Sequence, residues 1–416
     1  MISDIGICVV LYMEASKKEK IKQNRVGHLA STVQLAKRLI NHDHRIWVTV
    51  LCIQRFSSGF VDAYIEEPAR IHFIQLPQSY IDPVRNAVTN IVSMKSTSNS
   101  TRMSQLIWNS SEFEYPKPET RNTDLGHLIP GFANPVPSCV LPSFLFNKDG
   151  GYTAFVKFAE RFKDAKGIMI NTFEELEPYA LRCFSNAQNP PIYPFGPVIQ
   201  LDGLPNPELD LVQRDQEVFL CFGSMGSHEP PQVKEIALAL DRSGHKFLWS
   251  LHVPPAVDAA AGTVHFKNPE EMLPEGFLER IQERGMVCGW APQVEVLGHN
   301  AVGGFVSHCG WNSILESLWF SVPIVTWPMF AEQQLNAYMK KELGLAVVMR
   351  LDYRKGIRDV VMADEIEEGV RQVMDAGREV RKKVKKTEEM ARKAVMNGGS
   401  SFNSIGRFIE DMIGNI

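Results

Sequence analysis

Short apolar runs alternate along this chain with longer stretches in which apolar residues recur every three or four positions. Apolar runs that end at glycine, serine or proline turns are typical of buried parallel strands, and the longer stretches are typical of helices that cover them. The alternation favours an α/β fold of two doubly wound halves that face a cleft. The predicted strands, with the turns that follow them, are 46–53, 167–172, 217–227, 245–253, 286–292, 301–307 and 322–328, and the predicted helices are 29–40, 233–244 and 400–413.

Two stretches interrupt this alternation. Pro190–Pro207 contains six prolines, which cannot support regular strand ladders, so we predict a linker between the halves. Met94–Asp124 is rich in serine, threonine, asparagine and charge, which predicts a loop without a buried strand. The apolar run Ile5–Met13 is too short to span a bilayer and lacks a preceding basic region, so it is either a strand or a misplaced segment.

Composition excludes several classes of partner. With 44% hydrophobic and 22% charged residues, a formal charge of -4 and a pI near 6.3, the chain has no global attraction to nucleic acid or anionic membranes. We therefore expect small-molecule partners and no integral membrane segment. We also expect a monomer. The seven cysteines are scattered without CxxC pairs, which favours reduced thiols, a cytosolic location and no zinc site. The basic run Arg378–Lys393 is interspersed with glutamates and predicts a solvated helix face.

The stretch Trp290–Gln333 carries the most specific chemistry, and it reads WAPQVEVLGHNAVGGFVSHCGWNSILESLWFSVPIVTWPMFAEQ. A glycine-bearing apolar strand leads to His308, and a tight turn then leads to a helix in which Asn312 and Ser313 are residues of the type that cap helices. A helix N-terminus after a glycine turn directs backbone N–H groups and a positive dipole end to one point. This arrangement predicts an anion site that fits a diphosphate.

This stretch resembles the C-terminal signature box of plant family-1 UDP-glycosyltransferases, which glycosylate small secondary metabolites. The resemblance extends to GHLASTVQLAKRL, NPVPSCVLPS, KGIMINTFEELE, YPFGPV, FLCFGSMGS, SGHKFLWSL and LPEGFLER, and so covers most of the chain. It implies a GT-B fold of two Rossmann-like domains. On this basis we divide the chain into an acceptor-binding domain at 1–195 that is incomplete relative to the family, a linker at 196–213, a UDP-sugar-binding domain at 214–395, and a C-terminal helix at 396–416 that packs back on the first domain.

The resemblance also implies a role for individual residues in binding UDP-glucose. Trp290 would stack on uracil, with Ala291 and Gln293 beside the base and ribose, and Glu316 would accept hydrogen bonds from ribose hydroxyls. The diphosphate and sugar contacts would come from His308, Asn312, Ser313 and Ser224 for the diphosphate, and from Trp311, Glu332 and Gln333 for the sugar. Physical chemistry supports the match, because an aromatic face suits a base and a carboxylate suits vicinal hydroxyls. A closing glutamine, with no arginine in the box, resembles members that prefer glucose.

His28 matches the catalytic base of the family. The expected reaction is inverting: the imidazole takes a proton from the acceptor hydroxyl as this attacks the anomeric carbon and UDP leaves. The family pattern requires no metal or other cofactor, because a helix N-terminus and neutral donors stabilise the departing diphosphate. An imidazole with a pKa near ~6.5 suits a phenolic or flavonoid-like acceptor.

The N-terminal half departs from the family pattern at two places. The family has a buried strand ending in an aspartate where this chain has the polar stretch Met94–Asp124, and that aspartate normally orients the catalytic histidine. In addition, MEASKKEKIKQNRV separates the first apolar run from Gly27. The departures indicate a divergent copy, an aberrantly spliced copy or an imperfect gene model.

Three hypotheses follow. The first is an active UDP-glucosyltransferase, and the second is a UDP-sugar-binding protein that is catalytically impaired because it lacks the aspartate. The third, a nicotinamide-dependent oxidoreductase, rests on fold analogy alone, and the chain has no GxGxxG motif to support it. The acceptor itself cannot be read from the sequence, because acceptor pockets in this fold come from N-terminal loops.

Overall fold

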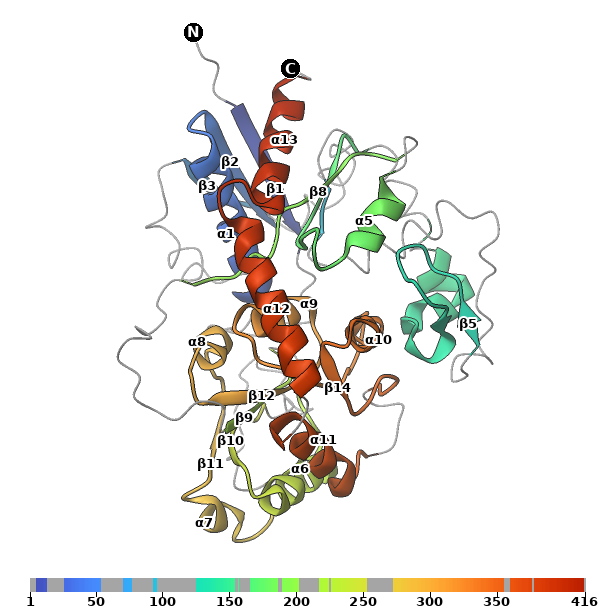
Figure 1. Cartoon of the computed structure of the whole chain (residues 1–416), viewed down its shortest axis with the longest axis vertical. Coiled ribbons are helices and arrows are strands. Elements are labelled where there is room, and N and C mark those ends of the chain that lie inside the picture. Colours follow the sequence, from blue (N-terminus) through green and yellow to red (C-terminus); the bar gives the residue numbers. More distant parts are fainter. Residues whose placement is uncertain are drawn as a thin grey trace.

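The computed structural model of the chain describes residues 5–12, 26–53, 70–76, 93–95, 125–153, 156, 165–185, 189–201, 217–223, 226–252, 272–354, 360–375 and 378–414. Figure 1 shows two α/β halves, with the long helix α12 (Arg378–Val395) leading from the C-terminal half toward the N-terminal half, where α13 (Ser400–Gly414) lies. In the described ranges no helix is both long enough and apolar enough to cross a membrane.

The C-terminal half is built on a six-stranded sheet in which every pair of neighbouring strands is parallel. The strand order is β11-β10-β9-β12-β13-β14, so the chain runs outward from β9 in one direction and then crosses to the other side of β9. In such sheets ligands bind where the order reverses, beyond the carboxyl ends of the two central strands. The strands are β9 (Glu217–Cys221), β10 (Lys246–Ser250), β11 (Gly285–Cys288), β12 (Val302–Ser307), β13 (Ile324–Thr326) and β14 (Ala346–Val348).

Helices cover both faces of this sheet, which is why its strands read as continuous apolar runs. Every residue of β12 is buried, and Gly304 in that strand leaves room for Val373 of α11, whose Cγ1 would lie 2.7 Å from an added Cβ. The helices are α6 (Pro230–Ser243), α7 (Phe277–Ile281), α8 (Gln293–Leu297), α9 (Trp311–Trp319), α10 (Gln333–Leu343) and α11 (Ala363–Asp375), with α12 packed against α9.

The N-terminal half contains two three-stranded parallel sheets among its described residues. One is β1 (Ile5–Tyr12), β2 (Ile46–Ile53) and β3 (Ile71–Leu76), with helix α1 (Val26–His42) packed against it. The other is β4 (Ser93–Lys95), β7 (Ile168–Ile170) and β8 (Ile192–Pro194), and helix α5 (Pro178–Phe184) connects β7 to β8 in the chain. The first apolar run is therefore a strand, and the α/β prediction of two doubly wound halves is confirmed by this parallel topology.

Two local predictions were wrong in part, both at sheet edges. Met94 and Lys95 belong to β4 and pair with β7, although the polar stretch 94–124 predicted loop; residues 96–124 lie outside the described residues. Within the proline-rich linker, β8 pairs with β7 through to Pro194. In the described sheet both strands lie at edges, where polar side chains and a missing proline N–H are tolerated.

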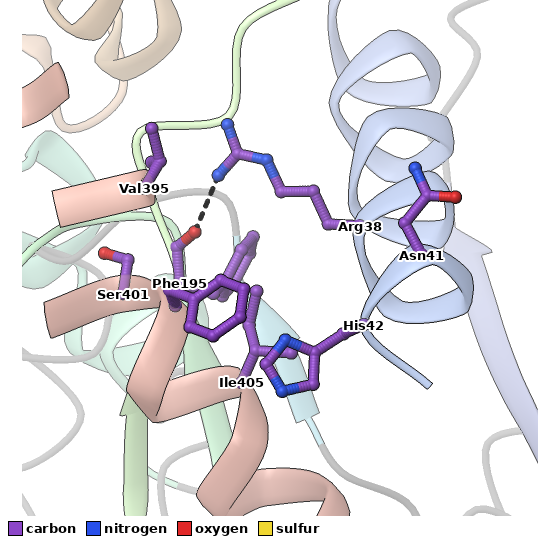
Figure 2. Close-up of a pocket in the computed structure, with 8 residues that line it drawn as sticks. Arg38, Asn41, His42, Phe195, Val395, Ser401 and Ile405 are labelled. Carbon is purple, nitrogen blue, oxygen red and sulfur yellow. Dashed lines mark hydrogen bonds between the residues drawn. The ribbon is translucent and has the colours of Figure 1, made fainter. Parts of the chain in front are cut away.

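The junction between the halves is held by contacts from both sides of the linker. Arg38 of α1 donates to the carbonyl oxygens of Phe195 at 2.9 Å and Pro197 at 2.7 Å, and Ser401 of α13 donates to that of Gly196 at 2.5 Å. Arg38, Phe195 and Ser401 line a cavity of about 180 Å³, and Figure 2 shows Arg38 reaching from α1 toward Phe195. The linker backbone is thereby tied to α1 and to the C-terminal helix at once.

The segment 125–152 lies between β4 and β7 in the sequence, but it packs on the C-terminal half. It consists of a short hairpin and three tight helical turns, and its apolar side chains join the same core as α9 and α10. Tyr338 of α10 donates to the carbonyl oxygen of Pro135 at 2.9 Å, and Arg354 donates to those of Cys139 and Leu141 at 2.8 and 2.6 Å. The elements are β5 (Gly126–His127), β6 (Val136–Pro137), η6 (Ser138–Val140), η7 (Ser143–Phe146) and η8 (Lys148–Tyr152).

Candidate functional site

The reversal point of the C-terminal sheet is lined by a histidine between two glycines. Gly223 follows β9 with φ of 70°, and His308 follows β12. A Cβ on Gly223 would lie 2.7 Å from His308 Nε2, and a Cβ on Gly310 would lie 2.5 Å from the same atom. Side chains at these two positions would displace the imidazole, so the two glycines leave room for the ring.

Helix α9 begins three residues after this histidine, with its N-terminus at the reversal point. Its N-cap is Gly310, in extended conformation and without a side-chain capping bond, so Asn312 and Ser313 do not cap the helix. They lie instead in the first turn, where backbone N–H groups have no intrahelical partner. The left-handed Cys309, with φ of 62°, makes the tight bend, and Asn336 of α10 holds it by donating to its carbonyl oxygen at 2.9 Å. The structure therefore has a helix N-terminus at the place where the sequence predicts an anion site, and the site itself stays a prediction.

His308 is neutral in this position. Burial lowers the pKa of its imidazole from 6.5 to about 4, a shift that the backbone contact with Cys221 opposes. At neutral pH the ring would therefore contribute a hydrogen bond to a diphosphate, not a positive charge.

A second polar group lies one helical turn further along α9, where Glu316 of α9 meets Gln293 of α8. Gln293, the first residue of α8, donates through Nε2 to Ser313 Oγ at 2.9 Å and to Glu316 Oε2 at 2.5 Å. Burial raises the pKa of the Glu316 carboxyl from 4.5 to about 7, and the Gln293 bond opposes the shift. Trp290, just before this group, is 50% exposed, whereas Ala291 is buried. Of the residues predicted for base and ribose, Trp290 thus offers an exposed aromatic ring and Glu316 a carboxyl that Gln293 orients.

The three residues predicted for the sugar differ in how they are held. The Trp311 indole is buried and donates its N–H to the carbonyl oxygen of Asn171 at 2.6 Å, which joins α9 to the end of β7. A sugar contact of Trp311 stays a prediction, and its backbone N–H in the first turn of α9 is the group that would make it. Glu332 is the N-cap residue of α10, and Gln333 Oε1 accepts from the backbone of Met329 and Phe330 at 2.9 and 3.1 Å.

The predicted base lies on the helix that faces α9. His28 is the third residue of α1, although its side chain lies outside the described residues, as does the whole of Ser224. One turn later on α1, Ser31 Oγ accepts from Asn312 Nδ2 at 3.1 Å. Helix positions three apart share a face, so the His28 backbone is one turn from a direct contact with the predicted diphosphate turn.

Sequence reasoning missed the residues that join the two sides of this site. Ser31, Asn171 and Glu177 come from the N-terminal half, and Lys340 of α10 is buried near the Cys309 turn. The sequence offered one signal, the polar pair that directly follows the buried strand 168–170. The partners of Ser31 and of Asn171 are more than a hundred positions away along the chain, and no local pattern indicates them.

Comparison with known proteins places these features in one family. The family model described as UDP-glucoronosyl and UDP-glucosyl transferase matches residues 211–374. UDP-glycosyltransferase 71K2 of Pyrus communis is 45% identical over 93% of this chain and 96% of its own length, and flavonol 3-O-glucosyltransferase UGT71C4 of Arabidopsis thaliana is 40% identical over 93% and 95%. The alignment with the Pyrus protein runs over 467 positions, more than the 416 residues of this chain, so that relative has segments that this chain lacks.

Solved structures agree with the sequence relatives. The crystal structure of Medicago truncatula UGT71G1 complexed with UDP-glucose superimposes with a TM-score of 0.82 at 38% identity, covering 98% of both chains. A transferase from Siraitia grosvenorii in complex with UDP gives a TM-score of 0.83 at 37% identity, covering 98% of this chain and 99% of the other. These similarities show the GT-B fold.

Proposed function

This chain belongs to the plant family-1 UDP-glycosyltransferases, and we propose that it transfers glucose from UDP-glucose to a hydroxyl group of a small phenolic or flavonoid-like acceptor. The single observation that supports this most is the arrangement at the sheet reversal, where the α9 N-terminus, Glu316 and the exposed Trp290 follow one another. An anion site, a carboxyl and an aromatic face in this sequence match diphosphate, ribose and base. The Medicago protein, similar over nearly the whole chain, was crystallised with UDP-glucose.

In the proposed donor complex each group has a distinct task. The α9 N–H groups, with Asn312, Ser313, Ser224 and neutral His308, would hold the diphosphate and stabilise the charge that grows on it as UDP leaves. Glu316, oriented by Gln293, would accept from the ribose hydroxyls, and Trp290 would stack on uracil. Gln333 and Glu332 would meet the glucose hydroxyls at the start of α10. No step in this scheme calls for a metal.

We assign the role of general base to His28. Its imidazole would take the proton of the acceptor hydroxyl while the hydroxyl oxygen forms a bond to the anomeric carbon and the bond from that carbon to UDP breaks, which inverts the configuration. The contact between Ser31 and Asn312 supports this assignment, because it brings the first turns of α1 to the predicted donor site. The position at which the family has its aspartate would fall within residues 96–124, which lie outside the described residues.

The impaired binding protein is the less favoured hypothesis. The relatives that align over 93% of this chain are named as UDP-glycosyltransferases, and one is a flavonol 3-O-glucosyltransferase. Flavonols are accordingly the first acceptors to test. A cytosolic location fits the free thiols of Cys139, Cys183, Cys221, Cys288 and Cys309. This location and a monomeric state both remain proposals.

The test is transfer of label from radiolabelled UDP-glucose to flavonols and simple phenols by the purified full chain, with UDP-galactose and UDP-glucuronic acid as alternative donors. We expect glucosides from at least one phenol, and loss of turnover in His28→Ala. His42→Ala is the matched control, because His42 ends the same helix and its ring lies against that of Phe402, with the ring centroids 4.4 Å apart. UDP-glucose binding without product from any acceptor would favour the impaired protein, and full turnover by His28→Ala would refute the assignment of the base.

A further inference from the structure

Lys340 is a fully buried lysine whose amine is left without a partner. It lies on α10 with 0% exposure, and its Nζ has no hydrogen bond to any residue in the described part of the chain. Asn336, one turn earlier on the same helix face, donates to the carbonyl oxygen of Cys309 at 2.9 Å. Lys340 is therefore directed toward the bend that leads into α9, behind the predicted diphosphate site.

Among the residues that the structure describes, few charged groups surround this amine. The ionisable groups that act on it are Cys309, from the bend before α9, and Glu177, just before α5. Glu177 accepts from Thr172 Oγ1 at 2.5 Å. Of the other elements packed on α10, β14 has no ionisable residue, η6 contributes Cys139, which acts on Tyr338, and Lys383 of α12 lies beside Gly344 at the far helix end.

Burial changes the protonation equilibrium of the Lys340 amine. Removing an ammonium from water without a counter-ion disfavours its charged form. Burial lowers the pKa of Lys340 from 10.5 to about 7, so that near neutral pH the empty protein contains both the amine and the ammonium. A negative charge placed at the α9 N-terminus would favour the ammonium.

The following inference rests on the proposed donor site. We propose that Lys340 is a positioning residue for the diphosphate, which takes up a proton when UDP-glucose binds and then stabilises the bound dianion from behind the Cys309 bend. The reaction is balanced by one proton taken from solvent per newly formed ammonium. Donor affinity then has a component that rises as the pH falls, because the protonated protein binds more tightly.

A rise of one unit in the pKa of Lys340 on binding would move its protonated fraction at pH 7.5 from about one quarter to about three quarters, an uptake of about half a proton. The contribution of Lys340 to the dissociation constant would change by nearly tenfold between pH 6 and pH 9, since one unit corresponds to ~10-fold. UDP-glucose is the suitable probe because its diphosphate has no free terminal phosphate that titrates in this range.

Titration calorimetry of UDP-glucose into the full chain, in HEPES and in Tris at pH 7.5, measures the proton uptake. The comparison is between wild type and Lys340→Met, since Met fills the same space without charge and is expected to raise the melting temperature. We expect uptake to be lower by about half a proton in Lys340→Met and in the second non-titrating variant, Lys340→Gln. Lys341→Met is the matched control, because Lys341 is exposed one position further along the helix.

The possible results are distinct. A drop in proton uptake in both Lys340 variants but not in Lys341→Met supports the inference. Normal UDP-glucose binding with unchanged uptake in both Lys340 variants overturns it and leaves the proposed function standing. A wild-type chain that does not bind UDP-glucose overturns the donor site and this inference together.

Discussion

Replacing Glu316 with glutamine should make the protein more stable and a poorer binder of UDP-glucose. Glutamine has the same shape and can still accept the hydrogen bond from Gln293 Nε2, which is 2.5 Å long in the structure. The substitution removes only the charge. Stability and donor binding should consequently change in opposite directions, because the buried carboxylate is costly to the fold and is the predicted ligand of the ribose.

The size of the stability gain follows from the carboxyl pKa, which burial raises from 4.5 to about 7. A folded-state pKa above the unfolded one means that the folded protein holds more protons between these values, so stability falls as the pH rises through that range. The penalty is absent below pH 4.5 and complete above pH 7. At ~1.4 kcal/mol per pKa unit it reaches at most about 3 kcal/mol, since the residue keeps some exposure.

Thermal unfolding of wild type and Glu316→Gln at pH 5 and pH 8 measures this effect. We expect Glu316→Gln to melt several degrees higher at pH 8 and nearly together with wild type at pH 5. At pH 8 the affinity for UDP-glucose, measured by calorimetry, should fall about 10- to 100-fold, the loss expected for a hydrogen bond to a charged acceptor. A melting difference that is the same at both pH values would refute the buried charge, and unchanged affinity would refute the ribose contact.

Three further substitutions test the site and the junction. Trp290→Ala should weaken UDP-glucose binding about 10-fold or more with little change in melting temperature, because the half-exposed indole is expected to stack on the base; an unchanged dissociation constant would contradict this. Trp311→Phe should lower stability by about 1–3 kcal/mol, because the buried carbonyl of Asn171 loses its donor, and urea unfolding that matches wild type would count against the bond. Gly310→Ala keeps an allowed backbone conformation but puts a Cβ 2.5 Å from His308 Nε2, so binding of UDP-glucose should fall at least tenfold by calorimetry, and wild-type affinity would show that the ring can move.

The pattern of apolar residues and glycine turns was sufficient to predict the central strands of the C-terminal sheet and the start of α9. The apolar runs at 217–221 and 302–307 became adjacent central strands, and the glycine turn after the second one became the start of α9. The capping prediction failed because an extended glycine, Gly310, ends the turn, and residues at the second and third helix positions have the same polar character as caps. Strand β8 was missed because a stretch so rich in proline predicts no strand. Proline lacks only its own backbone N–H, so it is tolerated in an edge strand such as β8.

The contacts that assemble the site could not be read from the sequence. Asn312 with Ser31 and Trp311 with Asn171 are joined across 281 and 140 positions, and the side chains involved have no unusual neighbours in the sequence. A lysine within QQLNAYMKKELG is ordinarily exposed, and only the packing of α10 against the Cys309 bend makes Lys340 a buried amine. Tertiary contacts of this kind decide the pKa values on which donor binding would depend.

Two buried groups, Glu316 in the predicted donor site and Lys340 behind it, have pKa values near neutrality and would respond to UDP-glucose in opposite directions. Ribose hydroxyls would favour the Glu316 carboxylate and release a proton, whereas the diphosphate would favour the Lys340 ammonium and take one up. In the wild type these exchanges would offset each other and leave donor affinity only weakly dependent on pH between 6 and 8. Glu316→Gln would then reveal the uptake and Lys340→Met the release, so that the two variants should show pH dependences of opposite sign.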